Sequence, residues 1–184
     1  MQRAAFLDRD GVINIDHAYV CRWEDFEFVD GVFDAARKLV QAGFVLVIVT
    51  NQSGIGRGYY SQSDFLALDK KVRQAFAEAG APISGVYFCP HHPTNALPQY
   101  KLVCNCRKPA PGMMIQAAKD LNIDLTKSIM FGDKKSDMQA ALAAGIPARV
   151  LLGTDGKATP EKTPEATLVA KNLLEGVDLI LNQR

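Results

Sequence analysis

Two aspartates stand one residue apart near the start of the sequence, at Asp8 and Asp10. They follow an apolar run, residues 4–7, and they precede Gly11, where the backbone can turn sharply. Two carboxylates this close repel each other unless a cation lies between them, and Mg²⁺ suits that place because it prefers oxygen ligands. The pattern therefore predicts phosphoryl transfer, in which Asp8 attacks phosphorus and forms a covalent aspartyl-phosphate. Asp10 would protonate the leaving oxygen and then activate the hydrolytic water.

An isolated D-x-D-G also fits an inert acidic turn, so the segments that follow decide between the two interpretations. Residues 44–49 are apolar without alternation, which is typical of a strand buried on both faces of a parallel sheet. Polar side chains come directly after this run, at Thr50, Asn51 and Gln52. Their hydroxyl and amide groups can donate hydrogen bonds to a phosphate oxygen, and backbone N–H groups before Gly54 can form an anion-binding nest.

A later apolar run, residues 128–131, leads into a second acidic segment. Asp133 would be a third oxygen ligand of Mg²⁺. Asp137 could anchor the loop or the water shell of the metal. Lys134 lies between these aspartates in the sequence and can either neutralise the acidic cluster or contact the substrate.

Three of the four cysteines cluster with a histidine in the pattern C-x-H, twelve residues, C-x-C. Three thiolates and one imidazole match a closed, tetrahedral structural Zn²⁺ site. We assign as its ligands Cys89, His91, Cys104 and Cys106. His92 is the alternative to His91, and Cys21 stands apart. Because such a site has no open position, the zinc would fold the loop over residues 89–108 and take no part in catalysis.

The predicted zinc loop leads directly into Arg107 and Lys108. Lys108 would neutralise the nucleophilic carboxylate and the transferring phosphate as a point charge, and the planar fork of Arg107 suits a second oxyanion on the substrate. A lone R-K pair also fits a solvated surface, but the adjoining metal site favours function. Arg57 lies in a glycine-rich segment that matches neither nucleotide-binding fingerprint. It could reach a distal phosphate or be a solvated charge.

The connection over residues 12–30 is long, and long ordered loops beside a catalytic strand end are usually functional. Its candidates for substrate contact are Asp16, His17 and Tyr19. A second set of aromatic side chains would pin the loop to the body of the protein, namely Trp23, Phe26 and Phe28. The sequence therefore predicts that this loop forms one wall of the substrate pocket.

These side chains need a sheet to position them, and 184 residues fit one domain, over 1–184, with enough core for a sheet covered by helices. Apolar runs predict strands over 4–7, 44–49, 86–88, 128–131, 148–152 and 167–169. Periodicity predicts helices over 31–42, 61–79, 111–121, 138–144 and 173–181, and a loop over 153–165. The fold class is α/β, in which ligands bind at the carboxyl ends of the strands.

The composition excludes several function classes. The net charge of +1 provides no field that would attract nucleic acid or a membrane surface, and no apolar run approaches the roughly 20 residues that span a bilayer. Without a signal-peptide pattern, we expect a cytoplasmic, monomeric enzyme with reduced cysteines and no nucleic-acid or membrane partner. A non-catalytic zinc-binding module for nucleic acid is the alternative, and the lack of a basic stripe argues against it.

The order D-x-D-G, T-N, K-P and G-D-x-x-x-D resembles the haloacid dehalogenase superfamily of phosphatases over nearly the whole chain. The resemblance implies a Rossmann-like three-layer sandwich with a mostly parallel central sheet, and no large cap domain fits into this length. It implies Asp8 as nucleophile and Asp10 as acid and base, with Thr50 and Lys108 stabilising the phosphoryl group. Mg²⁺ would bind the Asp8 carboxylate, the backbone carbonyl of Asp10 and Asp133.

Within the superfamily, the cysteine-histidine loop that runs into C-R-K-P is similar to the histidinol-phosphatase-related group. Its members act either on a heptose bisphosphate, removing the C7 phosphate, or on histidinol phosphate. The segments N-I-D-H-A-Y-V, T-N-Q-S-G-I-G-R-G and C-P-H-H-P favour the first kind, so the expected partner is a small sugar phosphate. The resemblance implies substrate contacts from Asp16, His17, Ala18, Tyr19, Thr50, Asn51, Gln52, Ser53, Arg107, Lys108 and Lys134.

Overall fold

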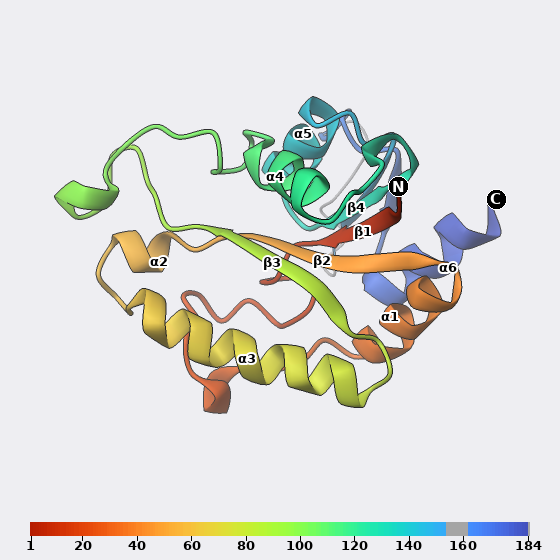
Figure 1. Cartoon of the computed structure of the whole chain (residues 1–184), viewed down its shortest axis with the longest axis horizontal. Helices are drawn as coiled ribbons and strands as arrows, with labels where there is room; N and C mark the ends of the chain where they lie inside the picture. The colour runs from red at the N-terminus through yellow and green to blue at the C-terminus, as the bar shows by residue number, and fades with distance from the viewer. Residues whose placement is uncertain (154–161, 184) are drawn as a thin grey trace.

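The computed structural model describes residues 1–153 and 162–183. Its centre is a sheet with the strand order β3-β2-β1-β4-β5-β6, in which each neighbouring pair is parallel (Figure 1). The strands are β1 (Arg3–Leu7), β2 (Phe44–Asn51), β3 (Ile83–Cys89), β4 (Ile129–Gly132), β5 (Ala148–Leu152) and β6 (Leu168–Ala170). The predicted α/β, Rossmann-like architecture is confirmed.

Helices cover both faces of the sheet (Figure 1). On one face lie α1 (Val32–Gln41), α3 (Gln62–Glu78) and α6 (Leu173–Asn182), and on the other lie α4 (Gly112–Asp120) and α5 (Lys135–Ala143). The short α2 (Ser53–Gly56) follows β2, and single 3₁₀ turns occur at Trp23–Asp25, Pro98–Tyr100 and Leu125–Lys127. No helix among the described residues is both long enough and apolar enough to cross a bilayer.

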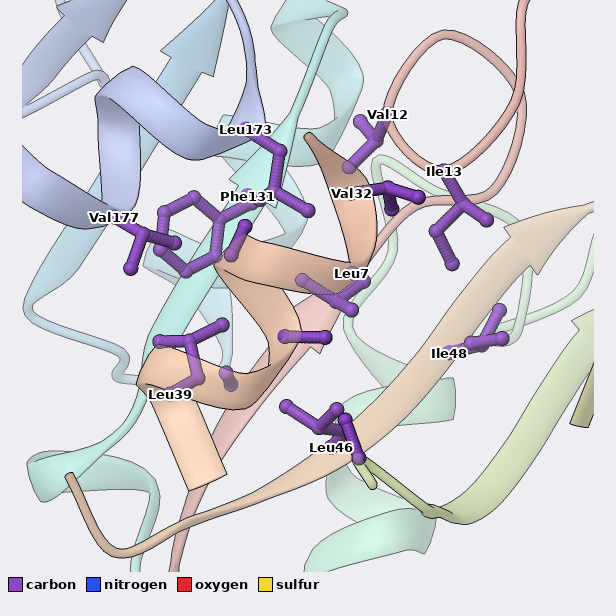
Figure 2. Packing of buried hydrophobic residues seen from close by; sticks show 14 of the residues in the cluster. Leu7, Val12, Ile13, Val32, Leu39, Leu46, Ile48, Phe131, Leu173 and Val177 are labelled. Atoms are coloured by element: carbon purple, nitrogen blue, oxygen red, sulfur yellow. The ribbon is translucent and has the colours of Figure 1, made fainter. Parts of the chain in front are cut away.

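The first strand shows why its sequence is apolar without alternation. Ala5 and Leu7 pack into the core under α1 and α6, whereas Ala4 and Phe6 pack into the core under α4 and α5. Figure 2 shows the first of these cores, where Leu7, Val32, Leu39, Phe131, Leu173 and Val177 lie together. Each fully buried Leu or Phe side chain contributes roughly 1.5–3 kcal/mol of hydrophobic stabilisation, so β1 is held firmly from both sides.

The register of the central strands brings three chain segments to one level. Leu7, the last residue of β1, lies beside Ile48 of β2 and Phe131 of β4. The residues that follow therefore leave the sheet together at its carboxyl edge. Because the strand order reverses beside β1, this edge is also the topological switch point, where open α/β sheets have their ligand crevice.

Several element boundaries differ from those predicted. Helix α5 begins at Lys135, three residues before the predicted start, because the Asp137 carboxylate accepts the backbone N–H of Lys134 (3.0 Å) and caps the helix. Strand β3 begins at Ile83, and α2 occupies a segment expected to be a polar loop. Of the loop predicted over 153–165, residues 154–161 lie outside the described residues.

The predicted start of α3 at Ser61 is confirmed by a capping box. The Ser61 hydroxyl accepts the backbone N–H of Asp64, and the Asp64 carboxylate accepts the backbone N–H of Ser61. We expect Ser61→Ala to lower the free energy of unfolding by about 1 kcal/mol, because the backbone N–H of Asp64 at the helix start loses its acceptor. Urea unfolding measures this change. The matched control Ser63→Ala, on an exposed site in the first turn of the same helix, should change stability by less than about 0.5 kcal/mol. Equal effects of the two variants would contradict the assignment of the cap.

Candidate active site

A cavity of about 500 Å³ opens at the carboxyl edge of the sheet, beside the ends of β1 and β2 and the start of α5. The predicted site residues that line it are Asp8, Asp10, Asp16, Ala18, Tyr19, Asn51, Gln52, Ser53, Arg107, Lys108 and Lys134. Thr50 lies just behind the wall, and His17 lies outside the cavity. The structure thus brings together side chains from segments more than 100 residues apart.

The floor of the cavity is a buried cluster of charges. The Lys108 ammonium lies 2.9 Å from Asp8 Oδ1 and 2.6 Å from Asp137 Oδ1, and it also donates to the carbonyl oxygen of Val49 (2.9 Å). Burial by itself would lower the pKa of Lys108, but the carboxylates of Asp137 and Asp8 outweigh it and raise that pKa. The lysine is therefore a permanent cation at the floor.

The carboxylates around this lysine lie close enough to share a metal ion. One oxygen from each of Asp8, Asp133 and Asp137 lies within 4.8 Å of the others. Burial, followed by the charge of Asp137, raises the pKa of Asp8 well above its usual range and that of Asp133 to about 6. Asp133 Oδ1 is buried and has no hydrogen-bond partner among the described residues. These features fit a site for a hard divalent cation, because such a cation would satisfy the orphaned oxygen and neutralise the carboxylates.

Two glycines make room for this acidic cluster. A Cβ atom on Gly11 would lie 2.2 Å from Asp133 Oδ2, and one on Gly132 would lie 2.3 Å from the Cβ of Asp137. Gly11 also has φ +89°, a conformation that L-residues adopt only with strain. The glycine in D-x-D-G therefore serves both the turn and the close approach of Asp133.

The second aspartate of the motif faces the cavity without joining the three-carboxylate cluster. Asp10 Oδ1 accepts hydrogen bonds from Arg9 Nη2 and Asn14 Nδ2, both at 3.0 Å. Its Oδ2 accepts from Gln52 Nε2 and from Arg9 Nη2, both at 3.2 Å. The predicted metal contact through the Asp10 backbone carbonyl stays a prediction.

The polar residues after β2 are held by one another. Gln52 Nε2 donates to Thr50 Oγ1 (2.9 Å), and Tyr60 donates to Gln52 Oε1 (2.5 Å). The Thr50 hydroxyl therefore accepts from Gln52 and keeps its own proton for another acceptor. The Asn51 side chain bonds to the backbone of Lys108 in both directions, at 3.0 and 3.1 Å. This amide thus fixes the lysine, and its predicted contact with substrate stays a prediction.

The mouth of the cavity carries charges of both signs. Lys134 Nζ lies 3.7 Å from Asp16 Oδ2, and Arg107 donates to the carbonyl oxygen of His91 (3.3 Å), which ties it to the cysteine-histidine loop. Ala18 and Tyr19 line the wall in left-handed backbone conformations, with φ of 59° and 55°.

His17 and Arg57 lie apart from the lining. His17 is exposed, with Nε2 2.9 Å from Glu27 Oε2, so the structure does not bring it to the cavity. The Arg57 guanidinium lies 5.8 Å from the ring centre of Tyr19. Its position leaves both interpretations of this arginine open.

The four predicted zinc ligands meet in a second cluster at the end of β3. The thiol sulfurs lie 3.0–3.5 Å from one another, and His91 Nδ1 lies 3.4 Å from the sulfur of Cys106. Figure 1 shows the long green loop that leaves β3 and returns to this point. His92 lies outside the cluster, because its Nδ1 accepts the backbone N–H groups of Thr94 and Asn95. The structure therefore brings His91, and not His92, to the three cysteines, and the assignment of zinc to this cluster stays a prediction.

Comparison with known proteins decides the family. A family model described as HAD-hydrolase-like matches residues 105–176. The D-glycero-beta-D-manno-heptose-1,7-bisphosphate 7-phosphatase of Yersinia pestis is 48% identical over 94% of this chain and 92% of its own length. The enzyme of the same name from Escherichia coli K12 is 45% identical over 98% of this chain and 95% of its own length. The chain belongs to this family of HAD phosphatases.

A solved structure of the same family has the same fold. The crystal structure of D,D-heptose 1,7-bisphosphate phosphatase from B. bronchiseptica, complexed with magnesium and phosphate, is 32% identical, with a TM-score of 0.83. The match covers 99% of each chain. The resemblance inferred from the four sequence motifs is therefore confirmed at the level of both family and fold.

Sequence reasoning did not anticipate all the residues that build the site in this phosphatase. Arg9 and Asn14 donate to Asp10, and Tyr60 donates to Gln52, but the sequence motifs alone do not point to these three residues. For Asp137 the sequence permits two roles, anchoring the loop or the water shell of the metal, and the structure places its carboxylate in the acidic cluster. The G-D-x-x-x-D spacing is the available signal, because it puts Asp133 just before the N-cap of α5 and Asp137 in the first turn of that helix.

The contact between Gly11 and Asp133 leads to a test. We expect Gly11→Ala to weaken the binding of a divalent cation about tenfold or more, about 1.4 kcal/mol, because the new methyl group must displace the Asp133 carboxylate. Isothermal titration with Mg²⁺ or Mn²⁺ measures the affinity. Gly80→Ala is the matched control, since Gly80 has φ +79° with nothing within 4 Å of the new atom. Gly80→Ala introduces a similar backbone strain to Gly11→Ala but no clash, so it should leave the cation affinity unchanged. Equal affinities of the two variants would contradict the placement of Asp133.

Proposed function

We propose that this protein is a Mg²⁺-dependent phosphatase that removes the C7 phosphate of D-glycero-D-manno-heptose 1,7-bisphosphate through an aspartyl-phosphate. The observation that carries the proposal is the 45–48% identity, over nearly the full length, to phosphatases named for this substrate. The buried Asp8, Lys108 and Asp137 at the floor of an open cavity support it, because charges are buried together where chemistry needs them.

The metal proposal rests on the donor set. Asp8 and Asp133 would hold Mg²⁺ through carboxylate oxygens, with Asp137 beside them and the Asp10 carbonyl as a further ligand. These are hard oxygen donors of the kind Mg²⁺ prefers, and the B. bronchiseptica relative was crystallised with magnesium. When bound, the ion supplies positive charge against the phosphoryl oxygens and the nucleophile.

The contacts of Asp8 orient it for attack. Its Oδ1 accepts from the backbone N–H of Arg9 (2.8 Å) and lies 2.9 Å from the Lys108 ammonium. Its Oδ2 has no hydrogen bond among the described residues and is the oxygen we assign to attack on phosphorus. Lys108 would stabilise the charge that develops on the transferring phosphoryl group, and the Thr50 hydroxyl would donate to one of its oxygens.

Asp10 completes the reaction. As the bond between phosphorus and the sugar oxygen breaks, Asp10 gives its proton to that oxygen and becomes a carboxylate. The carboxylate then takes a proton from the water that attacks the aspartyl-phosphate. Phosphate leaves, Asp8 is regenerated, and Asp10 is protonated again.

The mouth of the cavity suits the second phosphate of the substrate. Arg107 and Lys134 are cations on its wall, and a guanidinium can bind a phosphate through two parallel hydrogen bonds. A volume of about 500 Å³ is in the range of small-molecule sites. Histidinol phosphate remains the second candidate, because Asp16 at the mouth could pair with its amine.

The function is tested by initial rates of phosphate release in the presence of Mg²⁺. We expect turnover of heptose 1,7-bisphosphate to exceed that of histidinol phosphate at least about tenfold in kcat/KM, about 1.4 kcal/mol. Asp8→Asn should abolish turnover of both while the protein keeps its fold, because the amide is a poor nucleophile. A faster reaction with histidinol phosphate, or full activity of Asp8→Asn, would overturn the proposal.

We also propose that the cysteine-histidine cluster binds Zn²⁺ and thereby fixes Arg107 and Lys108. Removal of the metal by Cys104→Ser should abolish zinc binding, lower the melting temperature and raise KM about tenfold, about 1.4 kcal/mol, because both cations follow the cluster directly. Metal analysis, thermal unfolding and steady-state kinetics measure these effects. Cys21→Ser is the matched control, since Cys21 lies outside the cluster, and it should keep its zinc. Unchanged kinetics in a zinc-free protein would refute this role.

A further inference from the structure

Arg9 is a buried cation that the mechanism above does not use. Its side chain is almost fully buried, with only 4% of the residue exposed, and the ring centres of Phe26 and Phe65 each lie 5.8 Å from the guanidinium carbon. Its Nε has no hydrogen-bond partner among the described residues. A buried guanidinium is costly, so its few polar contacts must explain why it lies there.

Those contacts converge on one carboxylate and one loop. Arg9 Nη2 donates to Asp10 Oδ1 (3.0 Å), to Asp10 Oδ2 (3.2 Å) and to the carbonyl oxygen of Val20 (2.9 Å). Val20 follows Ala18 and Tyr19, which line the cavity. One guanidinium nitrogen therefore joins the carboxylate that we assign to proton transfer with the loop that forms the pocket wall.

We propose that Arg9 is a positioning residue, which holds Asp10 for protonation of the leaving oxygen and couples Asp10 to the substrate-facing part of the 12–30 loop. This inference rests on the proposed function, since it gives Asp10 the role of acid. It adds a residue that acts through Asp10 and does not touch the substrate. The aspartate is thereby placed by its own neighbour in the sequence.

The charge of Arg9 matters at the moment of proton transfer. When the bond between phosphorus and the leaving oxygen breaks, the proton moves from Asp10 to that oxygen and negative charge appears on the Asp10 carboxylate. Asn14 and Gln52 also donate to this carboxylate, but they are neutral. Arg9 is the cation in direct contact with it among the described residues, and its burial strengthens the interaction.

A second acidic side chain faces the same arginine without competing for its hydrogen bonds. Burial raises the pKa of Asp69 in α3, and the nearby charges of Arg73 and Arg9 oppose that rise. No hydrogen bond joins Asp69 to Arg9 in the described structure. The side-chain hydrogen bonds of Arg9 therefore go to the Asp10 carboxylate and to the backbone of the loop.

The role predicts a dependence on the leaving group. A sugar alkoxide is a poor leaving group and needs the proton of Asp10, whereas p-nitrophenolate leaves without one. Loss of the Arg9 contact should therefore slow the release of the leaving group from an alkyl phosphate far more than from p-nitrophenyl phosphate. This first step is the one to compare, because the later attack of water on the aspartyl-phosphate uses Asp10 with both substrates. A merely structural role would lower both rates by the same factor.

The test compares Arg9→Gln and Arg9→Lys with the wild-type enzyme on both substrates, with Mg²⁺ present. In single turnovers that follow release of the leaving group, we expect Arg9→Gln to lower the rate for heptose 1,7-bisphosphate about 100-fold, within the range that general acid catalysis contributes, and the rate for p-nitrophenyl phosphate less than about fivefold. Arg9→Lys keeps the positive charge but has a different hydrogen-bonding head, so its rates should lie between those of the wild-type enzyme and of Arg9→Gln. It also carries the test if Arg9→Gln does not fold. When Asp10→Asn is already present, adding Arg9→Gln should lower the rate further by less than about threefold, because Arg9 acts through Asp10.

Arg149→Gln is the matched control, because Arg149 also holds backbone carbonyl groups but lies at the amino end of β5, away from the cavity. It should leave the ratio of the two rates unchanged. Equal losses on both substrates in Arg9→Gln, or a full additional loss in the Asp10→Asn background, would overturn the inference. Failure of the proposed substrate is a separate result, since the comparison can be made with any alkyl phosphate that the wild-type enzyme hydrolyses.

Discussion

The structure depends on the burial of one ammonium group between two carboxylates. Lys108, Asp8 and Asp137 are each at most 5% exposed, and removing Lys108 would leave two buried carboxylates without their cation, which costs about 3–5 kcal/mol. Such a cluster persists only where the surrounding chain fixes every member. Here the carbonyl of Val49 and the amide of Asn51 complete the fixation of the lysine.

The members of this cluster reach it by different routes. Asp8 leaves the end of β1, and Asp137 lies in the first turn of α5 directly after β4, so the register of two neighbouring strands brings them together. Lys108 comes from a loop, so no strand fixes its position relative to the sheet. Its position is fixed instead by two neighbours. The cysteine-histidine cluster precedes it in the chain, and the Asn51 side chain is hydrogen-bonded to its backbone. The zinc ion that we propose at this cluster would therefore be part of the support for the lysine.

Much of this arrangement could be predicted from sequence because it depends on where strands end. Asp8, Thr50 and Asp133 each follow an apolar run, and parallel strands put such residues at one edge. Side-chain direction was not accessible in this way. His17 pairs with Glu27 outside the cavity, and the Asn51 amide turns to the Lys108 backbone, because these choices depend on tertiary neighbours. His91 and His92 are adjacent and equally suited as ligands, so only the fold could select between them.

The site divides into a rigid floor and a more adaptable mouth, and this division explains how one chemistry serves a particular substrate. The floor is made of strand ends and paired buried charges, which tolerate little change. The mouth is made of loops, where Lys134 and Asp16 pair at 3.7 Å with both side chains largely exposed. Such a pair contributes little stability and can be exchanged for contacts with a substrate. Arg9 connects the two parts, since it joins Asp10 to the 12–30 loop, whereas Arg107 belongs to the mouth. The contacts that we propose for the substrate can therefore change at the mouth while the buried charge cluster of the floor stays the same.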